Sequence, residues 1–157
     1  MNYVPEFEIM VSCIFMAYLA WVSWQDYREM QVVRYSHGLG LLAIVLGVFL
    51  QKAYIWNRGN EYFLAFLVLL LTQSASHWLK LYGLADAIVF FLCGLFFLVQ
   101  GGTEVYLLAY VMLQAISGGL LFVVQTVKRN RKGLNLKHAV PYIPYIYFAF
   151  ILTNVVL

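Results

Sequence analysis

Two acidic residues, Asp26 and Asp86, lie at the ends of long apolar runs. Asp26 follows the run over residues 9–24, and Asp86 lies in the segment that opens the run over residues 84–99. An ionisable side chain within or beside a membrane span is costly, so by default it indicates a functional site with a partner. Each aspartate is a natural partner for the other, because two carboxylates held together can hydrolyse a peptide bond.

Peptide hydrolysis by two carboxylates needs an asymmetry between them. One must accept a proton from water while the other donates a proton to the scissile carbonyl. Two carboxylates close together do not easily both ionise, so such a pair shares one proton and titrates as a unit. The structural requirement is that two helix ends lie side by side at one depth, with room for a water molecule.

The elements expected to hold the two aspartates are membrane helices. The chain has 157 residues, of which 64% are hydrophobic and 11% charged, and its mean hydropathy is +0.81. A soluble domain is about half apolar and about a quarter charged. The composition therefore predicts an integral membrane protein. Short connections without a linker-like stretch predict a single transmembrane domain over residues 1–157.

Six apolar stretches approach the length of about 20 residues with which a helix crosses the hydrocarbon. They predict an all-α, polytopic membrane helix bundle of about six transmembrane helices, over residues 8–24, 36–54, 62–79, 84–99, 105–127 and 139–157. Small residues four apart predict close contacts between these helices. The candidate pairs are Ser36 with Gly40, Ala43 with Gly47, and Ala115 with Gly119.

The basic residues orient these six spans in a plasma membrane. Lys52 and Arg58 fall on one side, and the other eight fall on the opposite side: Arg28, Arg34, Lys80, Lys128, Arg129, Arg131, Lys132 and Lys137. The positive-inside rule then places the eight in the cytoplasm and both termini outside. Under this topology Asp26 and Asp86 both lie at the cytoplasmic face, because two complete spans separate them.

No metal, cofactor or disulfide is predicted. Cys13 and Cys93 lie within apolar runs and form no Cys-x-x-Cys pair, and the histidines His37, His77 and His138 are scattered. The first eight residues lack the basic start of a secretory signal, so the first apolar run is expected to be a retained span. The net charge of +3 arises from the segments that flank the spans and does not indicate a nucleic-acid partner.

Each aspartate also has a purely structural interpretation. Asp26 could be an ordinary interfacial residue in a polar segment, paired with Arg28. Asp86 could be a helix N-cap, because Asp accepts hydrogen bonds from the N–H groups of a first helical turn. Spacing and periodicity alone do not distinguish these roles from catalysis.

Three segments resemble motifs of the type IV prepilin peptidase family, in the order in which that family carries them. Residues 26–33, which begin with Asp26, resemble its first active-site motif. Residues 83–86, which read Gly-Leu-Ala-Asp, resemble its Gly-x-Gly-Asp motif. Residues 140–146, which contain Pro141 and Pro144, resemble the Pro-Phe-x-Pro stretch that opens the last span. Ala85 replaces the second glycine of the family motif, and Ile88 stands where many members have Lys.

The resemblance implies a GxGD-type intramembrane aspartyl endopeptidase of the short, peptidase-only form. It implies that Asp26 and Asp86 are catalytic, that Gly83 and Ala85 position Asp86, and that no cofactor is required. The implied substrate is a pilin-like or pseudopilin-like precursor of type IV pili or protein secretion. Its basic leader would be cleaved at the cytoplasmic face, just before an apolar helix.

Four further residues are candidates for the wall of a substrate cavity. Gln73 and His77 lie near the cytoplasmic end of the third predicted span, and Pro141 and Pro144 lie at the start of the last one. The alternative for Gln73 and His77 is to tie helices together by hydrogen bonds. The alternative for the prolines is to start a helix, where Pro is well tolerated.

Two other functions remain open from the sequence. A small transporter or channel subunit would use Asp86 with Gln and His side chains inside the spans, although a proton relay prefers groups spread through the membrane depth. A non-catalytic homologue would bind a pilin-like helix without cleaving it. The departures at Ala85 and Ile88 favour that second alternative.

Overall fold

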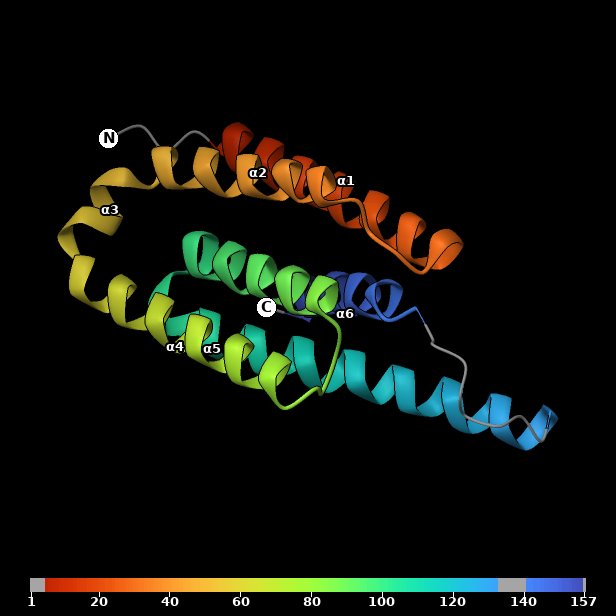
Figure 1. Ribbon diagram of the computed structural model, residues 1–157. Helices are drawn as coiled ribbons and strands as arrows, with labels where there is room; N and C mark the ends of the chain where they lie inside the picture. The colour runs from red at the N-terminus through yellow and green to blue at the C-terminus, as the bar shows by residue number, and fades with distance from the viewer. Residues whose placement is uncertain (1–4, 133–140, 157) are drawn as a thin grey trace.

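The chain folds into a bundle of helices, as a computed structural model shows (Figure 1). The structure describes residues 5–132 and 141–156, without the side chains of residues 5–7, 53–54 and 128–132. The helices are α1 (Pro5–Glu29), α2 (His37–Leu50), α3 (Lys52–Asn57), α4 (Gly59–Trp78), α5 (Leu84–Lys132) and α6 (Ile143–Val156), with a short 3-10 helix at Arg34–Ser36. No strand occurs in these ranges, so the all-α prediction is confirmed.

All six predicted apolar stretches are helical over most of their described length. The stretches over residues 84–99 and 105–127 both lie in α5, and part of the last stretch, residues 139–140 and 157, lies outside the described residues. Among the described helices, Glu8–Glu29 and Leu84–Val127 are long and apolar enough to cross a membrane, whereas Arg34–Leu50 and Ile143–Val156 are shorter apolar helices. The count of six spans therefore stays a prediction.

A single glycine divides α5 into two antiparallel halves. Gly102 has φ 71° and ψ −177°, a combination that is essentially restricted to glycine. Figure 1 shows that the chain reverses its direction there, so that residues 84–101 and 103–132 lie against each other. A Cβ built on Gly94 would lie 3.2 Å from the ring of Tyr110, which confirms that the two halves are in contact.

Close packing between helices depends on two of the three predicted small-residue pairs. A Cβ on Gly40 would lie 2.7 Å from the Tyr18 ring, and one on Gly47 would lie 2.9 Å from Val99. The glycines therefore let α2 approach α1 and the first half of α5. The prediction at Ala115 and Gly119 is wrong within this chain, because Ala115 is exposed and a Cβ on Gly119 would meet nothing within 4 Å.

The core lies between α1, the first half of α5 and α6, and its centre is aromatic. Phe15 stacks on Phe96 with 4.4 Å between ring centroids, and Phe97 stacks on Phe150 at 5.1 Å. Phe15 and Phe150 are buried, whereas large apolar side chains on the outward faces of the helices are strongly exposed. They include Trp21, Phe49, Phe63, Leu71 and Phe122. The bundle thus carries an apolar exterior as well as an apolar core.

The topology collects five helix termini at one end of the bundle. The end of α1, the start of α2, the end of α4, and the starts of α5 and α6 all lie there (Figure 1). The opposite end holds the turn at Gly102 and the start of α4, which are joined by charged groups. Arg58 contacts Glu61 at 2.9 Å and Glu104 at 3.1 Å, and Thr103 donates a hydrogen bond to Glu61.

Replacing Gly102 with alanine tests the reversal in α5. Because the backbone conformation of Gly102 disfavours a Cβ, we expect Gly102→Ala to lower the free energy of unfolding by about 1–3 kcal/mol. The matched control is Gly119→Ala, where helical backbone and open space predict no loss, or a gain of up to about 1 kcal/mol. Thermal unfolding in detergent measures both, and equal midpoints for the two variants would contradict the assigned conformation.

Candidate active site

The carboxylate of Asp26 joins the end of α1 to the start of α6. Its Oδ2 accepts a hydrogen bond from the N–H of Ile143 at 3.0 Å, across 117 positions of sequence, and the N–H of Tyr142 also interacts with it. One turn earlier on the same face, the Ser23 hydroxyl donates to the carbonyl of Ile143 at 3.5 Å. Asp26 is only 8% exposed. The first residue of α6 is thus held through both of its backbone polar groups.

The carboxylate of Asp86 lies in the first turn of α5. Its Oδ2 accepts a hydrogen bond from the N–H of Gly83 at 3.1 Å, and the carbonyl of Gly83 accepts from Ala87 at 3.0 Å. A side chain at the third helical position that accepts the N–H of the N-cap residue makes one of the two hydrogen bonds of a capping box. A Cβ on Gly83 would lie 3.3 Å from that Oδ2, so glycine leaves room for the carboxylate. Ala85 is half-buried and packs against the core.

The two aspartates are brought to the same end of the bundle. Asp26 lies close enough for its charge to act on Asp86. Both carboxylates also lie at helix N-termini, Asp86 at that of α5 and Asp26 at that of α6. The partial positive charge of a helix N-terminus stabilises a carboxylate. Within the described part of the chain neither carboxylate is recorded in an ion pair, so the prediction that Asp26 pairs with Arg28 has no support.

Tyr142, which the sequence did not single out, links the two carboxylates. Its backbone N–H interacts with Asp26. Its carbonyl accepts a hydrogen bond from the N–H of Tyr145 at 2.9 Å, in the first turn of α6. Its ring packs on Phe90, one turn after Asp86, with centroids 5.7 Å apart. Its hydroxyl lies 3.4 Å from Ser117 Oγ. The only sequence signal was its position between Pro141 and Pro144.

The four residues predicted to line a substrate cavity take different positions. Gln73 is buried, and its Oε1 accepts a hydrogen bond from the hydroxyl of Tyr82 at 2.9 Å. His77 is exposed. Pro141 and Pro144 are half-buried and flank the start of α6, where Asp26 binds. Three of the four therefore lie at or near the carboxylate pair or its aromatic neighbours, whereas His77 faces outward.

Buried polar contacts between α1 and α2 occur at this same end of the bundle. The hydroxyl of Tyr18 lies 3.0 Å from Nδ1 of His37, and Ser36 donates a hydrogen bond to Gln25 at 2.8 Å. His37 and Ser36 are buried. Neither pair is predictable from the sequence, because their members are 19 and 11 positions apart and lie on different helices. They hold α2 in register beside the helix that carries Asp26.

Comparisons with known proteins found no relative of this chain. The chain matches no protein-family model, no curated protein and no solved structure.

Substitutions of Tyr142 test how the starts of α5 and α6 are held together. We expect Tyr142→Ala to lower the free energy of unfolding by about 2 kcal/mol, because it removes a ring packed against Tyr82 and Phe90. Tyr142→Phe keeps the ring and loses only the 3.4 Å contact with Ser117, so a loss below about 1 kcal/mol is expected. Thermal unfolding of the purified protein distinguishes the two, and equal losses would refute a role for the ring.

Proposed function

We propose that this protein is a membrane-embedded aspartyl endopeptidase. The observation that carries the proposal is the meeting of Asp26 and Asp86 at one end of the bundle, within electrostatic reach of each other. Three other α-helices, α2 to α4, lie between α1 and α5 in the chain, so sequence neighbourhood does not account for the meeting. The resemblance of the three sequence segments to prepilin peptidase motifs agrees with the same pair of residues.

In the proposed reaction the two carboxylates share one proton. The ionised one takes a proton from water, the water oxygen bonds to the scissile carbonyl carbon, and the protonated one gives its proton to the carbonyl oxygen. Collapse of the resulting tetrahedral diol breaks the carbon–nitrogen bond while the protonated carboxyl gives its proton to the leaving amine. One diol hydroxyl gives its proton to the ionised carboxylate, so the products are a carboxylic acid and an amine and the pair again holds one proton. The N–H of Ile143 binds Oδ2 of Asp26 and the N–H of Gly83 binds Oδ2 of Asp86, so we assign Oδ1 of each aspartate to this chemistry. The mechanism needs no metal or organic cofactor.

The proposed setting is a plasma membrane crossed six times, with the carboxylate pair at the cytoplasmic face and both termini outside. Exposed apolar side chains on the outward faces of the helices support a lipid environment, because such a surface is costly in water. The described basic residues agree with the orientation. Arg28 lies in the last turn of α1, Arg34 just before α2 and Lys80 just after α4, which are the helix ends near the pair. Lys52 and Arg58 flank α3, near the start of α4.

The proposed substrate is a pilin-like or pseudopilin-like precursor. Such a precursor joins a basic leader to an apolar helix, and cleavage would fall between them at the membrane surface. The apolar helix would lie in the bilayer beside the bundle, which would bring the scissile bond to the end where the carboxylates lie. The basic leader would be attracted by the ionised carboxylate of the pair.

A non-catalytic homologue is the second candidate, and one observation favours it. Both aspartates accept backbone N–H groups at helix starts, as structural caps do. Such a protein would bind a pilin-like helix and release it uncut. Co-purification of an intact precursor with the wild-type chain, without any cleavage, would select this candidate over the peptidase. A transporter is less consistent with the geometry, because Asp26 near the end of α1 and Asp86 in the first turn of α5 interact with each other at one end of the bundle.

Conversion of either aspartate to its amide tests catalysis. We expect Asp26→Asn and Asp86→Asn each to lower the rate of cleavage of a co-expressed precursor by about a thousandfold, because each removes an ionisable group of the pair. The amide oxygen of Asn can still accept the N–H of Ile143 or Gly83, so the fold is expected to persist. The mass of the precursor, measured by mass spectrometry, reports the cleavage.

The matched control is Glu29→Gln, an exposed residue three positions after Asp26 in the same helix. We expect this variant to cleave at the wild-type rate. Normal processing by either aspartate variant would remove the assignment.

The orientation in the membrane has its own test. In a Cys13→Ser background, Lys52→Cys is expected to react with an impermeant maleimide in intact cells, whereas Arg34→Cys is expected to react only after permeabilisation. Both positions are exposed and belong to opposite ends of the bundle, and the remaining cysteine, Cys93, is buried. The opposite labelling pattern would invert the topology and place the carboxylates outside.

A further inference from the structure

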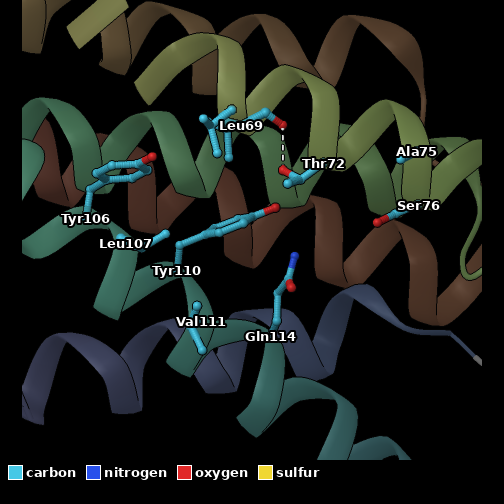
Figure 2. Close-up of a pocket in the computed structure, with 10 residues that line it drawn as sticks. Leu69, Thr72, Ala75, Ser76, Tyr106, Leu107, Tyr110, Val111 and Gln114 are labelled. Carbon is cyan, nitrogen blue, oxygen red and sulfur yellow. Dashed lines mark hydrogen bonds between the residues drawn. The ribbon is translucent and has the colours of Figure 1, made fainter. Parts of the chain in front are cut away.

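A pocket lies between α4 and the second half of α5, away from the carboxylate pair, and we call it the α4–α5 pocket. Its volume is about 380 Å³. Figure 2 shows Tyr110 crossing the pocket, with its hydroxyl directed towards Thr72 of α4 and with Gln114 beside it. The volume is in the range of small-ligand sites and admits a side chain, although not a whole helix.

The phenol oxygen of Tyr110 is buried without a hydrogen bond to any residue that the structure describes. The residue is 5% exposed. The polar side chains of Thr72 and Gln114 both interact with the phenol, but the Thr72 hydroxyl donates its proton to the carbonyl of Leu69 at 2.9 Å. A buried polar atom without a partner costs free energy, so it calls for an explanation. A hydrogen-bonding group from outside the chain would supply the missing partner.

The pocket opens on the outward face of the bundle. Leu107 and Val111, on its rim, are 54% and 55% exposed, and Thr72 is exposed as well. None of the residues that line it carries a formal charge. An ionised ligand group would be desolvated there without a counter-charge, which is unfavourable, whereas an uncharged hydrogen-bonding group would not.

The pocket is also connected to the candidate active site. The Ser117 hydroxyl donates a hydrogen bond to the carbonyl of Gln114, a lining residue, at 3.2 Å and lies 3.4 Å from the hydroxyl of Tyr142. Tyr142 in turn interacts with Asp26 through its backbone. A helix that lay along the outer face of α4 and the second half of α5 would therefore pass from the pocket towards the carboxylate pair.

We propose that the α4–α5 pocket is a specificity site that receives one uncharged hydrogen-bonding side chain, such as Asn or Ser, from the apolar helix of the substrate. Tyr110 and Gln114 supply the hydrogen bonds, and Leu107 and Val111 contact the apolar surface of the same helix. This inference rests on the proposed function for the identity of the helix. It adds a rule for substrate selection that acts inside the membrane, away from the bond that is cleaved.

The test measures binding separately from cleavage. Synthetic precursors carry a basic leader and an apolar helix of leucine and alanine, with a single Asn, Leu or Asp placed at successive positions along the helix. Energy transfer from the peptide to a label on Cys13, which is exposed while Cys93 is buried, reports binding to the wild-type protein in vesicles of phosphatidylcholine and phosphatidylglycerol. We expect one register at which the Asn peptide binds about three to ten times more tightly than the Leu or Asp peptide.

Two substitutions decide whether the pocket is responsible. Tyr110→Phe is expected to abolish the preference for Asn and to leave the binding of the Leu peptide and the thermal midpoint unchanged or higher, because the lost hydroxyl makes no hydrogen bond within the described chain. Tyr106→Phe, one turn earlier on the same helix and also in the pocket lining, is the matched control and is expected to keep the preference.

The outcomes separate this inference from the proposed function. Equal binding of the Asn and Leu peptides at every position overturns the specificity site, whether or not the peptides are cleaved. A preference that survives Tyr110→Phe overturns it as well. A preference that Tyr110→Phe removes supports the site even if no peptide is cleaved, in which case only the endopeptidase proposal fails.

Discussion

The hydrogen bond between the carboxylate of Asp26 and the N–H of Ile143 is the contact on which the candidate site depends. It fixes the start of the last helix against the end of the first, in a buried position where neither group could be left without a partner at low cost. The same contact brings Tyr142 over the first turns of α5. The distance between the two carboxylates is therefore set by the way in which α6 begins.

Capping and catalysis need not compete for these aspartates. Each carboxylate has two oxygens, and the hydrogen bonds from Ile143 and Gly83 use only Oδ2 of each. A backbone N–H at a helix start holds a carboxylate in place and favours its ionised form, while mutual repulsion between the two carboxylates opposes the loss of the second proton. Together these effects would give the pair of one ionised and one protonated carboxylate that peptide hydrolysis requires.

The reversal of the chain at Gly102 brings the polar side chains of the α4–α5 pocket into place. It folds residues 103–132 back along residues 84–101, so that Tyr110 comes to lie beside Gly94 and against α4. The same reversal sets Ser117 beside Tyr142. A single backbone conformation thus supplies both the support for the carboxylate pair and the polar floor of the α4–α5 pocket.

The sequence by itself determined the all-α class, the helical stretches, the close contacts at Gly40 and Gly47, and the choice of Asp26 and Asp86, because apolar runs, small residues and isolated charges are local features of the chain. Only the tertiary structure decided that the two carboxylates lie within reach of each other, that Asp26 binds Ile143, that Tyr142 lies between them, and that His77 faces outward. These depend on contacts between helices that are far apart in the chain, and no periodicity along one helix specifies the partner on another.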